Sequence, residues 1–178
     1  IGADFLTKII KYNEQDIYLQ IYDTAGNERF RSLGTAFYRD CDACIMVFDL
    51  HNIKSFNHLE FWYSEFALNS NINEISDFPI VVFGNKADIT DNNPINETDV
   101  KIFCAKKNIK YYPISVKQNS DSINEGFNYL IDNNLDKKNG EDIFQSYIEN
   151  KTPGAFRIFW HYNTQKEVII IVAITPHP

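Results

Sequence analysis

The chain has 178 residues and a hydrophobic content of 44%, which is enough for one globular domain with its own core. Its net charge of −7 and its pI near 5.0 exclude a general nucleic-acid binder, because such a protein needs a basic surface. Three cysteines, an odd number, give no disulfide framework and indicate reduced, intracellular thiols. Cys41-x-x-Cys44 has the spacing of a zinc or redox pair, but no second pair follows, so we interpret both as thiols at the start of a strand.

The first part of the chain predicts a β-hairpin. Residues 16–22 alternate with period two and place Ile17, Leu19 and Ile21 on one face, which is typical of a half-buried strand. Residues 2–11 carry apolar side chains that suit pairing with it, and the sequence Tyr-Asn-Glu-Gln between the two segments predicts the turn.

The middle of the chain alternates short apolar runs with helical patterns. Residues 43–48 and 79–83 are apolar throughout, as expected of parallel strands that are covered on both faces. An amphipathic helix is predicted between them, and a second helix, a strand over 110–114 and a third helix follow. The helical patterns rest on Phe56, Leu59, Tyr63 and Phe66, then on Val100 and Phe103, and finally on a capping box at Ser122 and Glu125 with Ile123, Phe127, Leu130 and Ile131 behind it. This order predicts an α/β sheet with right-handed crossovers.

Residues 137–178 differ in character from the rest. An irregular, aromatic segment leads to an aliphatic run at 168–174, which is far shorter than the ~20 residues of a membrane span. Two interpretations stay open: the run is an extra strand of the sheet, or the tail comes from a mis-spliced or frameshifted gene model. We expect residues 1–136 to form the main domain and 137–178 to form a divergent C-terminal tail.

One motif directly follows the strand at 16–22. Asp23-Thr24-Ala25-Gly26 places an aspartate at the carboxyl end of a strand, where open α/β sheets bind their ligands. Such an aspartate can hold Mg²⁺ through water, and Gly26 lets its backbone N–H approach a γ-phosphate. Taken alone, this pattern is equally typical of an ordinary turn.

A second motif follows the run at 79–83. In Asn85-Lys86-Ala87-Asp88, the Asp88 carboxylate can accept two hydrogen bonds from a guanine base, and adenine offers no matching pair of donors. Asn85 can bond the base edge and tie loops together, while the stem of Lys86 can cover the face of the base. The alternative is an ordinary surface loop.

Ser115-Val116-Lys117 follows the next predicted strand and completes the set. Its order and spacing after the other motifs indicate the same site, with the Val116 N–H meeting the guanine O6. The sequence therefore predicts GTP or GDP with Mg²⁺ as ligands. The phosphate-binding pattern G-x-x-x-x-G-K-[ST] is absent, because no Gly-Lys-Ser or Gly-Lys-Thr occurs in the chain.

These motifs and the sequences around them resemble the Rab family of small GTPases. The resemblance runs from residue 1 to about 135, and Ala3 with residues 32–34 looks most similar to the late-endosome and lysosome branch. It rests on Ile1-Gly2-Ala3-Asp4-Phe5, Tyr22-Asp23-Thr24-Ala25-Gly26-Asn27-Glu28-Arg29-Phe30, Ser32-Leu33-Gly34, Phe37-Tyr38-Arg39, Val47-Phe48-Asp49 and Trp62 with Glu65-Phe66. It implies a Ras-like P-loop NTPase G domain with a mostly parallel sheet, which switches between GTP and GDP and recruits effectors to membranes, served by an exchange factor and a GTPase-activating protein.

The resemblance also implies that parts of the domain precede Ile1: the first strand, the phosphate-binding loop, the first helix and the threonine of the first switch. The strands at 16–22 and 43–48 would then lose their shared neighbour, and each unpaired ladder group would cost roughly 1–3 kcal/mol. We therefore expect an N-terminally truncated chain that is not a stable switch by itself.

Three features suggest departures in activity. Asn27 stands where the family has the Gln that orients the attacking water, which predicts slow intrinsic hydrolysis because its side chain is one methylene shorter. Phe5, Tyr22 and Phe37 correspond to the aromatic triad on which Rab effectors dock, although they can also simply cover the sheet edge. No cysteine follows Cys104, so the C-terminal lipid anchor that would bring a cytoplasmic protein to late endosomes, lysosomes or the vacuole is not present in this chain.

Three hypotheses follow. The chain is a Rab-type GTPase with Asn27 as its catalytic residue, or a catalytically deficient remnant that acts as a protein-binding module, or an inactive fragment.

Overall fold

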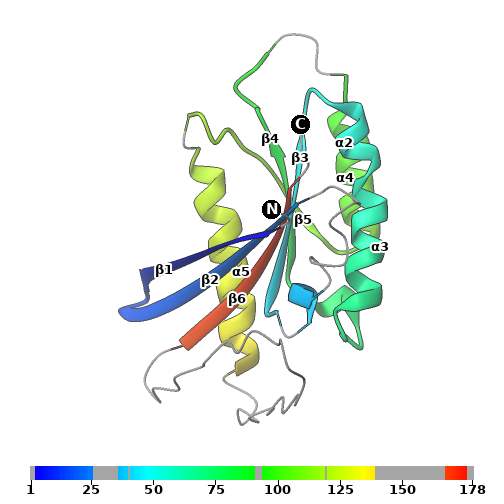
Figure 1. The fold of residues 1–178 in the computed structure, drawn as a ribbon. Helices are drawn as coiled ribbons and strands as arrows, with labels where there is room; N and C mark the ends of the chain where they lie inside the picture. The colour runs from blue at the N-terminus through cyan, green and yellow to red at the C-terminus, as the bar shows by residue number, and fades with distance from the viewer. Residues whose placement is uncertain are drawn as a thin grey trace.

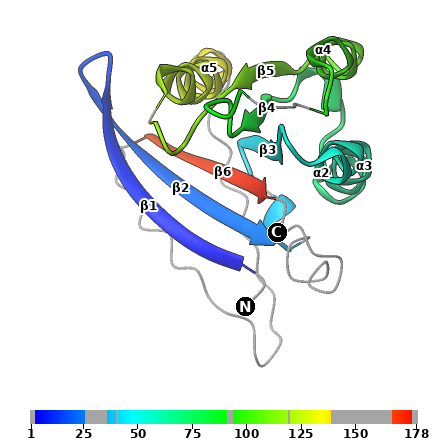
Figure 2. The same ribbon diagram turned by 90° about the horizontal axis from the view of Figure 1, so that it is seen from above.

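The computed structural model describes residues 3–25, 36–39, 41–90, 94–118, 120–138 and 167–175. In these ranges six strands form one mixed sheet in the order β1-β2-β6-β3-β4-β5, with helices on both faces (Figures 1 and 2). The strands are β1 (Ala3–Tyr12), β2 (Gln15–Ala25), β3 (Ala43–Asp49), β4 (Ile80–Asn85), β5 (Lys110–Pro113) and β6 (Glu167–Thr175). The helices are α2 (Ile53–Asn57), α3 (Leu59–Asn69), α4 (Glu97–Lys106) and α5 (Asp121–Lys138), with a short 3-10 helix, η2 (Ile75–Asp77). The mostly parallel α/β sheet that the sequence predicts is confirmed.

The predicted hairpin forms the outer edge of this sheet. β1 and β2 pair antiparallel from Ala3 opposite Thr24 to Tyr12 opposite Gln15. The two residues between them, Asn13 and Glu14, have φ angles of 47° and 65°. Positive φ at both central residues is what a type I′ turn requires, and this turn matches the twist of the two strands.

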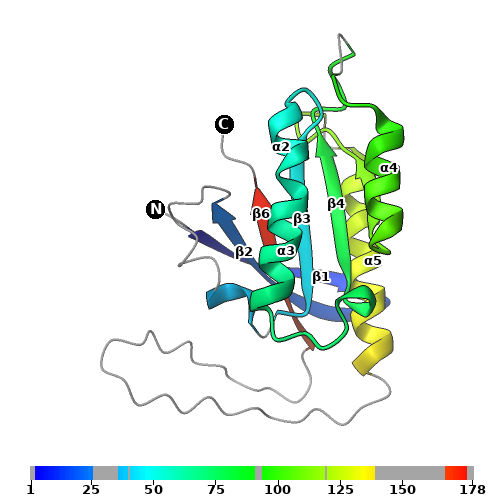
Figure 3. The ribbon, with the colours of Figure 1, turned by 90° about the vertical axis from the view of Figure 1, so that its right-hand side faces the viewer.

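The parallel part of the sheet is buried on both faces. β3, β4 and β5 pair in parallel, and four consecutive residues of β3 and five of β4 are buried. α3 and α4 cover one face, while α5 covers the opposite face (Figures 2 and 3). The helices that follow β3 and β4 pack on one face of the sheet, and the helix that follows β5 packs on the other.

The predicted helix after β3 is present as two helices that follow each other directly. Only His58 separates α2 from α3, and hydrogen bonds continue through it: its N–H donates to the Lys54 carbonyl at 3.1 Å, and the Trp62 N–H donates to its carbonyl at 3.0 Å. The apolar stripe therefore runs through both helices, with Leu59 and Phe66 in the core.

The capping box predicted at Ser122 is wrong. α5 already begins at Asp121, which places Ser122 inside the first turn and Ser120 immediately before the helix. The Ser120 hydroxyl accepts a hydrogen bond from the Ser115 N–H at 3.2 Å, so it ties the preceding loop together. The apolar stripe behind it is confirmed, with Leu130 and Ile131 fully buried against the sheet.

β6 gives the largest correction to the sequence analysis. The strands at 16–22 and 43–48 were expected to lose a shared neighbour, but β6 lies between them and pairs in parallel with both (Figure 1). The expected cost of unpaired ladder groups therefore does not arise along this stretch. Of the two interpretations of the aliphatic run, the structure supports the extra strand.

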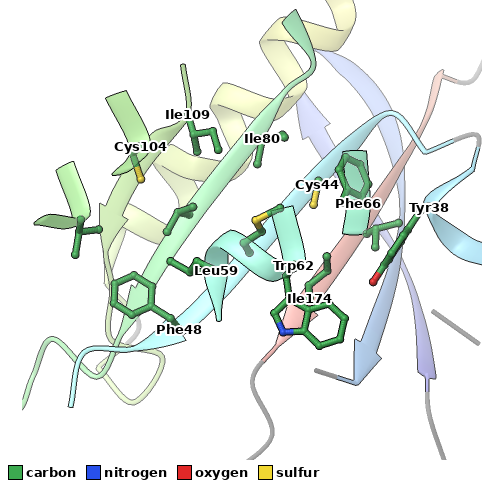
Figure 4. Close-up of a cluster of buried hydrophobic side chains, with 14 of the residues drawn as sticks. Tyr38, Cys44, Phe48, Leu59, Trp62, Phe66, Ile80, Cys104, Ile109 and Ile174 are labelled. Carbon is green, nitrogen blue, oxygen red and sulfur yellow. The ribbon is translucent and has the colours of Figure 1, made fainter. Parts of the chain in front are cut away.

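Two apolar clusters lie on either side of the sheet. The cluster under α3 and α4 includes Phe48, Trp62 and Phe66 (Figure 4), and the cluster under α5 includes Leu130 and Ile171. Cys41, Cys44 and Cys104 are buried and form no disulfide, and burial raises the pKa of Cys104 to about 12. In the described ranges, no helix has the length and apolarity to cross a bilayer.

Candidate guanine-nucleotide site

The candidate site lies along the edge where the parallel strands end. β3 ends at Asp49, β4 at Asn85 and β5 at Pro113, and the loops that follow β4 and β5 carry the predicted guanine motifs. Since these strands run in parallel, their carboxyl ends share one edge, which is where open α/β sheets bind ligands.

The Asn85 side chain joins the two predicted base-binding loops. Its Oδ1 accepts hydrogen bonds from the Lys86 N–H at 2.8 Å and from the Val116 N–H at 3.2 Å. The loops are also joined by backbone bonds, from the Ala87 N–H to the Ile114 carbonyl at 2.9 Å and from the Ile114 N–H to the Gly84 carbonyl at 2.8 Å. Two loops distant in sequence therefore form one local unit.

Asp88 is held in place by Ser115. The Ser115 hydroxyl donates to Asp88 Oδ1 at 2.6 Å and accepts from the Gln118 N–H at 3.1 Å. This hydrogen bond is the main reason that the pKa of Asp88 lies below its usual value, and the positive charge of Lys117 contributes further. Asp88 is thus a carboxylate of fixed orientation at neutral pH, as a residue that accepts hydrogen bonds from a base must be.

Lys86 extends toward Asp49, a residue that the sequence analysis gave no role. Its Nζ lies 2.7 Å from Asp49 Oδ2, and Lys86 itself adopts a φ of 69°, in the left-handed region. Partial burial alone raises the pKa of Asp49, but the hydrogen bonds from Lys86 and from the His51 N–H outweigh it and the net pKa is lowered. The signal was available, because Asp49 directly follows an apolar strand, as Asp23 does.

Val116 and Lys117 complete this group on the exposed side. The Val116 side chain is 63% exposed, and its N–H, predicted to meet the guanine O6, here donates to Asn85 Oδ1. The predicted base-site residues thus lie at the end of β4 and in two loops that contact each other: Asn85, Lys86, Asp88, Ser115, Val116 and Lys117.

Asp23 also lies near the carboxyl end of its strand, β2, but apart from the residues of the two loops. The strand register puts Asp23 of β2 in one row across the sheet with Ala173 of β6, Ile45 of β3 and Val81 of β4. Val81 lies four residues before Asn85 along β4. At about 3.3 Å per residue this offset is about 13 Å along the strands, and three strand spacings of about 4.8 Å add roughly 14 Å across them. Only an extended ligand can therefore reach both places.

Asp23 supplies a single carboxylate, so a metal ion bound there must be held mainly by water and phosphate oxygens. In the part of the chain that the structure describes, no three His, Cys, Asp or Glu side chains gather into a metal-binding group. Asp23 is an exposed carboxylate at the end of β2, and Mg²⁺ commonly takes one or two carboxylates together with waters and phosphates. Gly26 and Asn27 lie outside the described residues.

An aromatic cluster lies beside the end of β2. The ring of Tyr22 is 5.1 Å from that of Phe5 and 4.8 Å from that of Phe37, between centroids. Phe5 is 52% exposed whereas Tyr22 is 7% exposed, so the cluster presents mainly Phe5 to solvent and rests on the core through Tyr22.

Comparison with known proteins gives the family of this chain. Residues 1–136 match the Ras family. The chain is 41% identical over 147 residues to the Ras-related protein Rab7 of Pisum sativum, an alignment that covers 81% of the chain and 71% of the relative. It is 42% identical over 146 residues to the GTP-binding protein yptV5 of Volvox carteri, with the same coverage, and 37% identical over 163 residues to the Ypt/Rab-type GTPase Rab7 of Neurospora crassa, covering 86% of the chain and 79% of the relative.

The mixed sheet with its two helical layers agrees with the Ras-like fold. The chain belongs to the Ras family, and within it to the Rab small GTPases of the Rab7 branch.

Proposed function

We propose that this protein is a Rab-type switch that binds GTP and GDP with Mg²⁺, hydrolyses GTP and acts in endosomal trafficking. The observation that carries this proposal is the hydrogen bond of 2.6 Å from the Ser115 hydroxyl to Asp88, in a loop unit that Asn85 closes. In this proposal residues 1–136 carry the nucleotide site, and the tail at 137–178 contributes a strand to the same sheet.

The base would bind at the unit formed by the two loops. Asp88 would accept hydrogen bonds from the two donors of guanine, with Ser115 fixing its orientation. The stem of Lys86, held across the edge by Asp49, would cover one face of the base. The Val116 N–H would exchange its long bond to Asn85 for the guanine O6, and Lys117 would add positive charge nearby.

The phosphates would lie toward the end of β2. Asp23 would hold Mg²⁺ through water, and the metal would supply charge neutralisation for the phosphate oxygens. Gly26 would contact the γ-phosphate through its N–H, and Asn27 would orient the attacking water weakly. The offset between Asp23 and Asn85 supports this division, because it separates the two ends of one extended ligand.

The test is calorimetric titration of the full chain with GDP and Mg²⁺, with ADP as the competing ligand. We expect GDP to bind, ADP to bind at least tenfold more weakly, and Asp88→Ala to weaken GDP binding at least tenfold, since two hydrogen bonds to a charged group are lost. Asp16→Ala is the matched control, because Asp16 is an exposed aspartate at the opposite end of β2. A folded wild-type chain that binds neither nucleotide would refute the proposal.

A second candidate function, favoured by the aromatic cluster, is that of a protein-binding module without catalysis. The exposed Phe5 ring over Tyr22 and Phe37 suits the docking of a Rab effector, and a membrane-bound late-endosomal or vacuolar form would need a lipid anchor. The two functions differ in nucleotide dependence: effector capture that is equal with GDP, with GTP and without nucleotide supports the module alone. Capture that requires GTP supports the switch, and exchange factors and GTPase-activating proteins would then be further partners.

A further inference from the structure

β6 is held between two strands that do not pair with each other. It pairs with β2 from Ile17 beside Glu167 to Ala25 beside Thr175, and with β3 from Ala43 beside Ile171 to Met46 beside Ile174. Figure 2 shows β6 between the outer hairpin and the helix-covered strands. β6 therefore joins the hairpin, which carries Asp23, to the strands that carry Asp49 and Asn85.

Two side chains, one from β2 and one from the residue before β3, form hydrogen bonds with the main chain of β6. The carboxylate of Asp42 accepts a hydrogen bond from the Ile170 N–H at 2.7 Å, and the Asp42 N–H donates to the Ile170 carbonyl at 2.8 Å. On the other side, the hydroxyl of the buried Thr24 donates to the Ala173 carbonyl at 2.9 Å. Every extended segment without proline offers these same groups, so these contacts recognise a strand and not a particular sequence.

Selectivity arises from the two faces of the strand. Ile169, Ile171 and Ala173 enter the cluster under α5, whereas Val172 and Ile174 enter the cluster under α3 and α4. All five side chains are buried. The place between β2 and β3 therefore accepts an apolar strand with a small residue where Ala173 lies.

We propose that the gap between β2 and β3 is a peptide-binding site for an extended apolar strand in parallel orientation, and that residues 167–175 are its intramolecular ligand. A separate peptide with the same pattern then replaces β6. Occupancy of this gap decides whether the two parts of the nucleotide-site edge are joined. The inference does not depend on nucleotide binding, because it rests on strand pairing alone.

The first test uses the full chain and a fluorescein-labelled peptide of residues 167–175 with two added lysines at each end. In the variant Ile171→Asp, the chain's own strand cannot enter, because a carboxylate would replace a side chain that is 0% exposed. The matched control is Ile9→Asp, at a residue of β1 that is 56% exposed. We expect fluorescence anisotropy to show saturable binding of one peptide per Ile171→Asp chain, at least tenfold tighter than to the wild type or to the control. Equal binding to all three chains, or no binding to an Ile171→Asp chain that circular dichroism shows to be folded, would overturn the proposal.

The second test keeps every wild-type contact of β6, in case Ile171→Asp does not fold. A protease site is inserted between Lys138 and Glu167, and the folded chain is cut there. We expect the released segment to co-elute with the rest in gel filtration and to exchange with the labelled peptide. A peptide carrying Ala173→Trp should not exchange. The proposal is wrong if the segment separates while the rest keeps its circular-dichroism spectrum, or if the labelled peptide never enters the cut protein.

Discussion

Truncation of Ile171 to alanine tests whether β6 belongs to the core. The side chain is 0% exposed, and its backbone lies beside Ile21 of β2 and Ala43 of β3. Because strands flank it on both sides and α5 covers it, the site cannot collapse easily around the lost atoms. We therefore expect a loss near the upper part of the range for such changes, about 4 kcal/mol out of a typical stability of ~5–15 kcal/mol.

The assay is urea denaturation followed by circular dichroism. With a slope of about 2 kcal/mol per molar urea, the midpoint should fall by roughly 2 M while the slope stays constant. Ile9→Ala, at the exposed position in β1, is the control and should change stability by no more than about 0.5 kcal/mol. If Ile171→Ala also stays within about 0.5 kcal/mol of the wild type, residues 167–175 do not lie in the sheet and the reasoning on β6 fails.

Three further outcomes are expected. Gly126→Ala should destabilise the protein by about 1–2 kcal/mol in the same assay. The new Cβ would lie 2.5 Å from the buried Phe83 ring, and this overpacking outweighs the gain of about 1 kcal/mol in helix propensity. A stabilised variant would contradict this reasoning. The pKa of Asp49 in the folded protein is lower than its usual value of 3.8. The pairing of Asp49 with Lys86 therefore stabilises the protein at pH values above 3.8, and this stabilisation is lost as the pH falls through the pKa of the folded state. Asp49→Asn should therefore be less stable than the wild type at pH 7 and approach it as the pH falls below 3.8, whereas parallel pH curves would exclude the effect. Burial raises the pKa of Cys104 to about 12, so this thiol should resist iodoacetamide at pH 8 in the folded protein and react in urea. Mass spectrometry would measure the labelling, and rapid labelling without urea would mean that Cys104 is accessible.

Local sequence patterns determined the helices and strands and pointed to the candidate site. Period-two alternation gave β2, continuous apolar runs gave β3 and β4, and helical spacing gave the stripes of α3, α4 and α5. These predictions succeeded because each depends on neighbours within a few residues. The residues of the candidate site could also be predicted, because Asn85 ends β4, while Asp88 and Ser115 lie shortly after β4 and β5, and the carboxyl ends of these parallel strands must meet.

The tertiary structure alone decided which strands are neighbours and which side chains meet across them. The aliphatic pattern of residues 167–175 is compatible with any buried strand, and only the pairing with β2 and β3 places it at the centre of the sheet. The pair of Lys86 with Asp49 and the hydrogen bond from Ser115 to Asp88 likewise join residues from different loops or elements. Periodicity reports whether a segment is buried and on which face, but strand order depends on contacts between distant segments, and a one-dimensional pattern does not contain them.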